Sequence, residues 1–324
     1  MNVVLQNCVI FILLLIIEIG YFWVAKKLKI YDLPNCRSSH SDMTIRGGGM
    51  IFYFAVLLYF ILTPGMWELW LFLGITIVSV VSFCDDIKPI DTKIRLLFQI
   101  IGFAMILYQL NVFNIDGWKT LIIIFVCICI LNVYNFMDGV NGMTGIYSLV
   151  TLCTLLYINE KVIWFVYTNF IVYVIFADLI FLFFNFREKA VCFAGDVGSI
   201  CMGCIIIYLI ARLIIMSPGQ FSYMVFLIVY GADGGFTVIR RLFLRKNIFH
   251  PHRSQIFQLL SNEGRIPQVM VSSIYAALQL AINIGFFHVT HRYLYMIVIT
   301  VILTAAHISI YLHFDRKFPD KLIK

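Results

Sequence analysis

The sequence predicts an all-α fold, a polytopic membrane helix bundle that forms a single domain over residues 1–324. Hydrophobic residues make up 62% of the chain and charged residues only 13%, whereas about 25% of the residues of a soluble domain are charged. Apolar runs of 15 to 22 residues recur along the whole length, close to the ~20 residues with which a helix crosses a bilayer. These runs are too long and too uniformly apolar for the alternating strands of a membrane barrel.

About eleven transmembrane helices are expected. They lie at about 3–24, 47–63, 68–83, 94–110, 118–134, 142–158, 162–184, 199–216, 222–239, 270–288 and 293–312. The first run carries Glu18 and is followed by lysines without a small-residue cleavage site. We therefore expect a retained span rather than a cleaved signal peptide.

The distribution of basic residues predicts the orientation of the chain. If the amino terminus lies outside, the inside segments are 25–46, 84–95, 135–141, 185–198, 240–269 and 313–324. These segments contain 20 of the 24 lysines and arginines. Because cytoplasmic loops carry an excess of Lys and Arg, we expect an outside amino terminus and a cytoplasmic carboxyl terminus (N-out/C-in).

Polar residues gather in the same inside segments. The groups are "DLPNCRSSH" with "IRGGG", "FCDDIKPIDTKIR", "NVYNFMDGVNG", "FAGDVGS", and "GADGGFTVIRR" with "HPHRSQIFQ". The outer loops, such as "TPGMWE", look like simple connectors. Polar groups confined to one face of the membrane predict that they converge on a single cytoplasmic site.

The pair Asp85 and Asp86 directly follows the apolar stretch "VSVVSFC". A solvated helix end is the simplest interpretation of such a pair. At the hydrocarbon boundary, however, charge is costly and tends to be functional, so the pair suggests a divalent cation or a cationic partner. The glycines of "GDVGS" and of 47–49 either form ordinary turns and helix starts, with Ser199 as an N-cap, or let a phosphate approach the backbone.

These carboxylates, asparagine amides, glycine turns and arginines suit a Mg²⁺-bound pyrophosphate. Mg²⁺ usually takes one or two carboxylates together with substrate phosphates, and arginines can neutralise the remaining negative charge. The membrane setting indicates that one substrate is a lipid. The predicted reaction class is phosphoryl transfer at the bilayer surface, in which positioning and charge neutralisation matter more than a protein nucleophile.

The same blocks, in this order, resemble the polyprenyl-phosphate N-acetylhexosamine-1-phosphate transferases of glycosyl transferase family 4. The resemblance covers nearly the whole chain and is nearest to the bacterial branch that starts O-antigen and capsule chains. It implies transfer of an N-acetyl sugar-1-phosphate from a UDP-sugar to undecaprenyl phosphate, with release of UMP and initiation of a lipid-linked glycan. It also implies a multi-pass protein of the bacterial cytoplasmic (inner) membrane whose active site faces the cytoplasm. The implied partners are the UDP-N-acetyl sugar, undecaprenyl phosphate and membrane lipid, and no nucleic acid is expected.

The resemblance further implies roles for individual residues. Asp196 and Asn135 would hold Mg²⁺, for which Mn²⁺ can substitute. The residues at catalytic positions are Asp85, Asp86, Asp138 and Asp196. The residues at substrate-binding positions are Asn35, Arg37, Arg95, Asn141, His252 and Arg253, of which Asn141 matches the position that reads the uracil. Two positions depart from the family pattern: Asn141 stands where many members have Asp, and Gln255 stands where relatives often have His.

Several alternatives stay open at this point. Asp85 is either a general base or a group that positions the lipid phosphate and metal. Positioning is favoured, because a phosphate monoester with a second pKa of about 6 is mostly dianionic at neutral pH. Glu18 and Asp178 lie within predicted spans, where they serve either a proton relay or hydrogen bonding in the bundle, and a secondary transporter that uses them is the alternative function. The sequence leaves open the N-acetyl sugar, the polysaccharide pathway and the oligomeric state, including a homodimer.

Overall fold

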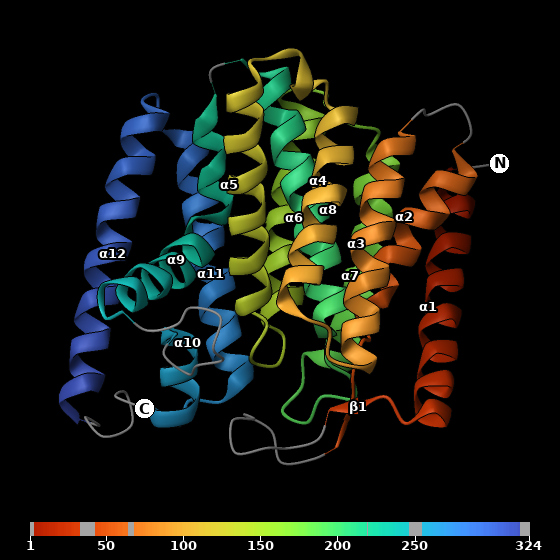
Figure 1. The fold of residues 1–324 in the computed structure, drawn as a ribbon, viewed down its shortest axis with the longest axis horizontal. Helices are drawn as coiled ribbons and strands as arrows, with labels where there is room; N and C mark the ends of the chain where they lie inside the picture. The colour runs from red at the N-terminus through yellow and green to blue at the C-terminus, as the bar shows by residue number, and fades with distance from the viewer. Residues whose placement is uncertain (1–2, 33–42, 64–67, 219, 246–254, 318–324) are drawn as a thin grey trace.

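The computed structural model describes the chain except residues 1–2, 33–42, 64–67, 219, 246–254 and 318–324 (Figure 1). Long helices dominate, which confirms the predicted all-α membrane bundle. The elements in chain order are α1 (Val3–Leu28), β1 (Tyr31–Asp32), β2 (Thr44–Ile45), α2 (Met50–Leu62), α3 (Leu69–Ile87), α4 (Thr92–Gln109), the 3-10 helix η1 (Val112–Asn114), α5 (Gly117–Phe136), α6 (Met143–Lys161), α7 (Thr168–Asn185), α8 (Gly195–Met216), the 3-10 helix η2 (Phe221–Leu227), α9 (Ile228–Phe243), α10 (Ile256–Gln258), the π-helical turn η3 (Leu259–Glu263), α11 (Gln268–His288) and α12 (Arg292–Lys317).

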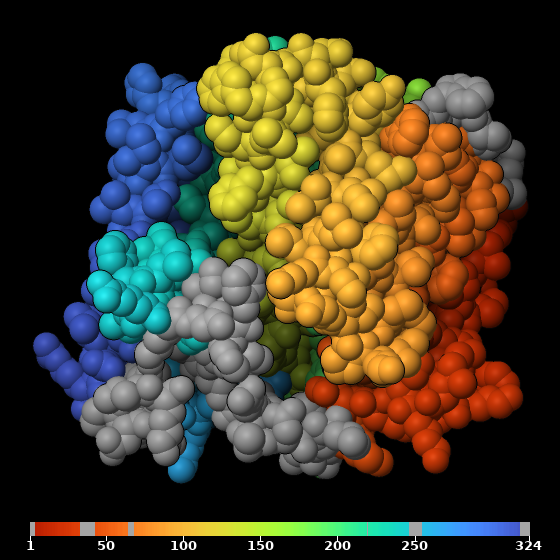
Figure 2. All heavy atoms as spheres, in the orientation of Figure 1, coloured from red at the N-terminus to blue at the C-terminus, as the bar shows by residue number. Residues whose placement is uncertain are grey.

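Each of the eleven predicted segments contains one of these helices. Within the described residues, eight helices are long and apolar enough to cross a membrane, and the apolar helix α2 is shorter. The number of crossings and the N-out/C-in orientation stay predictions. The space-filling view places α1 and α12 at opposite edges of the molecule (Figure 2). Large apolar side chains are exposed on both helices, among them Ile16 and Val301, as expected for surfaces that face lipid.

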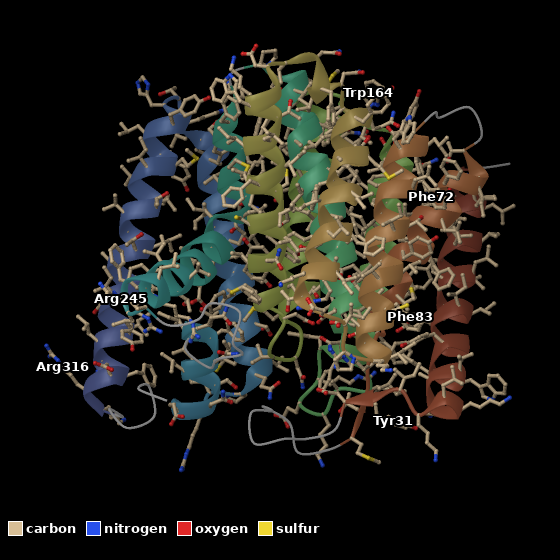
Figure 3. The ribbon with its side chains drawn as sticks, viewed as in Figure 1. Tyr31, Phe72, Phe83, Trp164, Arg245 and Arg316 are labelled. Carbon is tan, nitrogen blue, oxygen red and sulfur yellow. The ribbon has the colours of Figure 1, made fainter. Side chains whose placement is uncertain are left out.

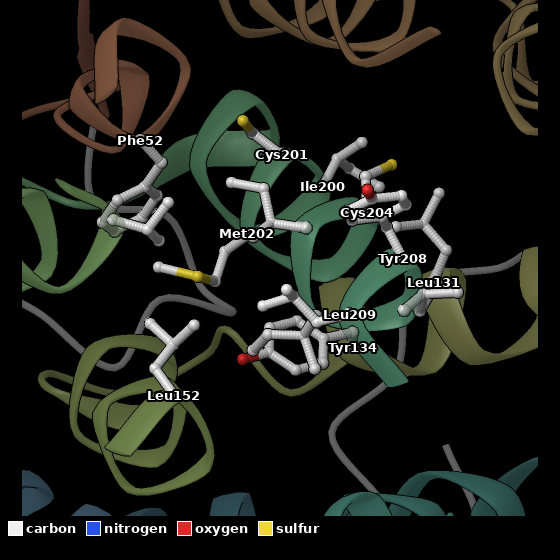
Figure 4. Packing of buried hydrophobic residues seen from close by; sticks show 14 of the residues in the cluster. Phe52, Leu131, Tyr134, Leu152, Ile200, Cys201, Met202, Cys204, Tyr208 and Leu209 are labelled. Carbon is white, nitrogen blue, oxygen red and sulfur yellow. The ribbon is translucent and has the colours of Figure 1, made fainter. Parts of the chain in front are cut away.

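Helix α8 forms the centre of the bundle. Among the candidate spans it is the most buried, with 72% of its apolar window inside the protein, against 6% for α12. Figure 4 shows Met202 and Leu209 of this helix packed among side chains from α2, α5 and α6, including Phe52 and Leu152. The amino-terminal end of α8, which carries the "GDVGS" motif, is therefore held by several neighbouring helices.

The ninth predicted segment, 222–239, is not one straight helix. It begins as η2 and continues as α9, which lies across the bundle rather than along it (Figure 1). A break in apolar surroundings frees backbone groups that need other partners. Gln279 of α11 supplies them, because its Nε2 donates to the Val225 carbonyl at 3.0 Å and its Oε1 accepts from the Val229 amide at 3.2 Å.

A short hairpin adds the only sheet in the described part of the chain. Strands β1 and β2 pair antiparallel, and Ile45 also forms a parallel bridge to Cys192. The chain that follows β2 runs beside the segment before α8, since the Gly48 amide donates to the Phe193 carbonyl at 2.9 Å. The hairpin thus brings the "IRGGG" motif to the start of α8.

Candidate active site

Charged side chains from four separate parts of the sequence meet at one end of the bundle. They come from the segment between β2 and α2, the end of α3, the first turn of α4 and the first turn of α8, and they are Arg46, Asp85, Asp86, Arg95 and Asp196. Figure 3 shows oxygen and nitrogen atoms concentrated near Phe83, toward the end of the bundle that carries Tyr31. We refer to these five residues as the carboxylate cluster. Its formation agrees with the expectation that the inside segments converge.

Asp86 caps helix α8. Its Oδ1 accepts from the Asp196 amide at 2.9 Å and its Oδ2 accepts from the Val197 amide at 2.9 Å. The first amides of a helix have no partner within the helix and carry partial positive charge, so the carboxylate satisfies both requirements. Arg46 Nε donates to the same Oδ1 at 2.7 Å, and the Asp86 side chain is fully buried.

The start of α8 differs in one respect from the sequence interpretation. Ser199 is not the N-cap, because its hydroxyl lies inside the helix and donates to the Asn135 Oδ1 at 2.5 Å. Gly195 adopts a φ of +72°, and a Cβ at this position would lie 2.6 Å from Asp86 Oδ2. Glycine is thus required for backbone conformation and for space, so that the capping carboxylate can reach the helix.

Asp196 lies between two guanidinium groups. Arg95 Nη1 donates to Asp196 Oδ2 at 2.8 Å and also to Asp85 Oδ2 at 2.7 Å. Arg46 Nη2 lies 3.7 Å from Asp196 Oδ1. The Asp196 side chain is 21% exposed and both arginine side chains are about a third exposed, so this part of the cluster can be reached from outside the protein.

The motif "NVYNFMDGVNG" lies next to the cluster. Asp138, in the loop between α5 and α6, accepts from the Thr144 hydroxyl at 2.7 Å. The pKa of Asp138 is raised to about 6, chiefly by burial and also by the negative charge of Asp86, while the hydrogen bond from Thr144 and the charge of Arg46 oppose the shift. Asp138 therefore belongs electrostatically to the carboxylate cluster.

Asn141 is engaged with the protein itself. Its Nδ2 donates to the carbonyls of Arg187 and Glu188 at 2.8 and 3.1 Å, and its backbone amide donates to Gln268 Oε1 at 2.9 Å. The residue is buried, and its side chain and backbone amide together join the loop before α8 to the start of α11. Its predicted contact with a uracil stays a prediction.

The structure does not place the remaining candidate residues in the carboxylate cluster. The substrate-binding candidates Asn35, Arg37, His252 and Arg253 lie outside the described residues. Asp178 is fully buried in α7, and neither carboxylate oxygen has a hydrogen-bond partner among the described residues.

Two features of the site were not among the predicted site residues. Arg46 pairs with two of the aspartates, and its position directly before 47–49 in the sequence was the available signal. Glu18 of α1 lies beside the hairpin, with its Oε1 4.0 Å from Cys192 Sγ, and nothing in the sequence links these two positions.

The donor atoms present fit a divalent cation. When ionised, the three aspartates of the cluster and Asp138 exceed the two guanidinium groups by two negative charges. Among the described residues, no three His, Cys, Asp or Glu side chains are grouped as a metal site, because Asp86 faces backbone amides and Asp85 and Asp196 face arginines. A Mg²⁺ ion that uses one or two carboxylates and completes its shell with substrate oxygens matches this arrangement.

Comparison with known proteins finds two similarities. The family model described as glycosyl transferase family 4 matches residues 68–214, the segment that holds every aspartate of the site. A probable undecaprenyl-phosphate N-acetylglucosaminyl 1-phosphate transferase of Bacillus subtilis (strain 168) is 26% identical over 276 residues, which cover 78% of this chain and 75% of the relative. This chain is similar to glycosyl transferase family 4 and to a polyprenyl-phosphate sugar-1-phosphate transferase. The comparisons support the resemblance seen in the sequence, and the carboxylate cluster lies in the matched segment as the candidate active site.

Proposed function

We propose that this transferase moves an N-acetyl sugar-1-phosphate from a UDP-sugar to undecaprenyl phosphate and releases UMP. The observation that carries the proposal is the position of Asp196, an accessible carboxylate between Arg46 and Arg95 at the end of the membrane helices. Such a site can receive a charged nucleotide from the aqueous side and a lipid phosphate from the membrane. The name of the Bacillus subtilis relative, a probable undecaprenyl-phosphate N-acetylglucosaminyl 1-phosphate transferase, supports the same acceptor and an N-acetyl sugar.

The proposed reaction needs one bond to form and one to break. An oxygen of the lipid phosphate bonds to the sugar-bearing phosphorus of the donor, the bond from that phosphorus to the bridging oxygen breaks, and UMP leaves. Arg46 and Arg95 can turn their guanidinium groups from carboxylates to phosphate oxygens, since such groups bind either anion with paired N–H donors. Their charge would stabilise the transition state in a site partly shielded from water.

Mg²⁺, with Mn²⁺ as a substitute, is the proposed cofactor. Asp196 and Asn135 would hold the ion, which would neutralise charge on the pyrophosphate. Asp85 acts in this proposal by positioning, because its Oδ1 accepts from the Ile90 amide at 2.7 Å and its Oδ2 faces Arg95. A lipid phosphate that is already dianionic needs little help from a base.

The proposed setting is the bacterial cytoplasmic membrane with the site facing the cytoplasm. The product would start a lipid-linked glycan of the cell envelope, such as O-antigen, capsule or a related polysaccharide. The alternative of a secondary transporter rests on Glu18 and Asp178, both fully buried. Transporter sites usually lie near the middle of the membrane, whereas the charged groups here gather at one end of the bundle.

A direct assay tests the proposal. Purified protein in detergent receives UDP-N-acetylglucosamine, undecaprenyl phosphate and Mg²⁺, and UMP is quantified. A panel of other UDP-N-acetyl sugars, with the lipid product weighed by mass spectrometry, identifies the donor. UMP release that depends on the lipid acceptor supports the proposal. Absence of acceptor-dependent release with every donor in the panel would refute it.

A further inference from the structure

The buried carboxylate of Asp233, on α9, forms hydrogen bonds to two other elements. Its Oδ1 accepts from the Ile256 amide of α10 at 3.0 Å, and its Oδ2 accepts from the Tyr275 hydroxyl of α11 at 2.7 Å. The Phe257 amide lies 3.4 Å from the same Oδ2. On α12, His307 Nδ1 lies 3.6 Å from Oδ1. A buried carboxylate needs such partners, so Asp233 fixes where α10 sits relative to α9, α11 and α12.

Helix α10 in turn packs on the loop that carries Asp138. A Cβ built on Gly139 would lie 2.7 Å from the ring of Phe257, which shows that the fully buried ring rests directly on the loop backbone. The Gln255 amide nitrogen lies 3.7 Å from Met137 Sδ. Residues on both sides of Asp138 therefore touch the segment 255–257.

These two sets of contacts form a chain from Asp233 to the candidate active site. The carboxylate holds the backbone of α10, and the side chains of Gln255 and Phe257 contact Met137 and the backbone at Gly139. A shift of α10 would move Asp138, a predicted catalytic residue whose pKa the charge of Asp86 helps to raise. In an enzyme, a displacement of about 1 Å at the reacting groups can reduce the rate about 10²-fold.

We propose that Asp233 is a positioning residue of the transferase: it holds α10 against the loop 137–139 and so sets the place of Asp138. The proposal rests on the proposed function for its effect on catalysis. Whether Asp233 holds α10 against the loop can be measured without any substrate. Asp233 does not contact the carboxylate cluster in the described structure and acts only through α10.

The test substitutes Asp233→Asn, which keeps the size of the side chain and replaces one acceptor oxygen with a donor that faces another donor. Two measurements are made on the purified full-length protein. Hydrogen–deuterium exchange is followed in peptides that cover 255–258 and 137–142. The kcat and KM for UDP-N-acetylglucosamine are measured by UMP release. We expect faster exchange in both peptides, a kcat lower by about 10- to 100-fold, and a KM within about threefold of wild type.

Asp178→Asn is the matched control. Asp178 is also a fully buried aspartate on a membrane helix, but its oxygens have no hydrogen-bond partner among the described residues. This variant should keep wild-type exchange in both peptides and a kcat within about twofold of wild type. A merely structural effect of removing any buried negative charge would change both variants alike.

Tyr275→Phe is a second variant that tests the same proposal. It removes a single hydroxyl from the Asp233 carboxylate and decides the question if Asp233→Asn does not fold. The same changes are expected, with a smaller loss of kcat of about two- to fivefold. Unchanged exchange at 137–142 overturns the proposal, and so does faster exchange with wild-type kcat. If wild-type protein releases no UMP, the proposed function fails, while the exchange data still decide whether Asp233 holds α10 on the loop.

Discussion

The three aspartates of the carboxylate cluster differ in what their oxygens contact. Asp86 accepts from backbone amides at the start of α8, and Asp85 accepts from the Ile90 amide as well as from an arginine. Asp196 faces the guanidinium groups of two arginines. Asp196 can therefore exchange its partners for a metal and substrate, whereas Asp86 cannot do so without loosening α8.

This difference predicts separate effects of two equivalent substitutions. Asp196→Asn should lower kcat by about 10²- to 10³-fold with little change in melting temperature. Asp86→Asn should lower the melting temperature, because a weakened helix cap costs about 1–2 kcal/mol. UMP release and thermal unfolding are measured for both variants.

EDTA should abolish wild-type activity, and Mg²⁺ or Mn²⁺ should restore it. Full activity in Asp196→Asn would remove this residue from the proposed metal site.

The raised pKa of Asp138 predicts how its charge affects stability. The folded protein holds the proton of Asp138 up to a pH of about 6, against an ordinary pKa of 3.8. The stabilisation from the neutral form is therefore fully present below about pH 4 and lost as the pH rises through about 6. Asp138→Asn, which can still accept from Thr144, should be more stable than wild type at pH 8 and equally stable near pH 4. Thermal unfolding from pH 4 to 8 in EDTA measures this, and a difference independent of pH would contradict it.

At the scale of elements, α2 and α8 cross at glycines next to the active site. A Cβ on Gly198 would lie 2.6 Å from the Gly49 Cα, and one on Gly49 would lie 2.3 Å from the Gly198 Cα. Neither neighbour can move as a flexible side chain would, because both contacts are with backbone. The close approach of the two helices therefore fixes the position of Asp196 relative to α2, because Asp196 lies two positions before Gly198.

Gly198→Ala should consequently impair both folding and activity. Overpacking of this kind costs about 1–3 kcal/mol, so the melting temperature should fall and kcat should fall with it. Gly20→Ala is the control, because a Cβ on Gly20 of α1 meets no atom within 4 Å and alanine favours a helix. A Gly198→Ala protein as stable and active as Gly20→Ala would show that the two helices separate easily.

The transition from η2 to α9 depends on Gln279. Gln279→Leu keeps the size of the side chain but leaves the Val229 amide without its Gln279 acceptor and the Val225 carbonyl with only the Ile228 amide as donor. Each unsatisfied buried group costs about 1–3 kcal/mol, so the melting temperature should fall by several degrees. Thr300→Val is the control, since that hydroxyl donates to the Met296 carbonyl of its own helix and faces outward. Equal melting temperatures of the two variants would contradict the role of Gln279.

At the scale of the whole molecule, the polar groups lie at one end of the bundle. Trp164 lies at the opposite end from Tyr31 and Arg316 (Figure 3). The positive-inside bias, 20 of 24 basic residues, predicts that the polar end faces the cytoplasm. Reporter fusions near residues 90 and 190 should report a cytoplasmic location, and fusions near 160 and 290 an outside location. A reversed result for 90 or 190 would refute the orientation and the cytoplasmic site.

The sequence by itself determined the fold class, the approximate helices and the candidate residues of the site. Apolar run length, charge distribution and local motifs are properties of short segments, and the bilayer allows few structures for such segments. For this reason the sequence alone indicates Asp85, Asp86, Arg95 and Asp196 as candidate site residues. The sequence predicts that these residues share one face of the membrane, but it does not predict which of them contact one another.

Only the tertiary structure decided how those residues are used. Asp86 binds backbone amides 110 positions later in the chain, Arg95 bridges to a carboxylate 101 positions away, and Asn141 binds the loop before α8 rather than an open site. The crossing of α9 and the anchoring role of Asp233 depend in the same way on neighbours from distant segments. A side chain's partners are set by which helices pack together, and that packing is a property of the whole chain that no local pattern contains.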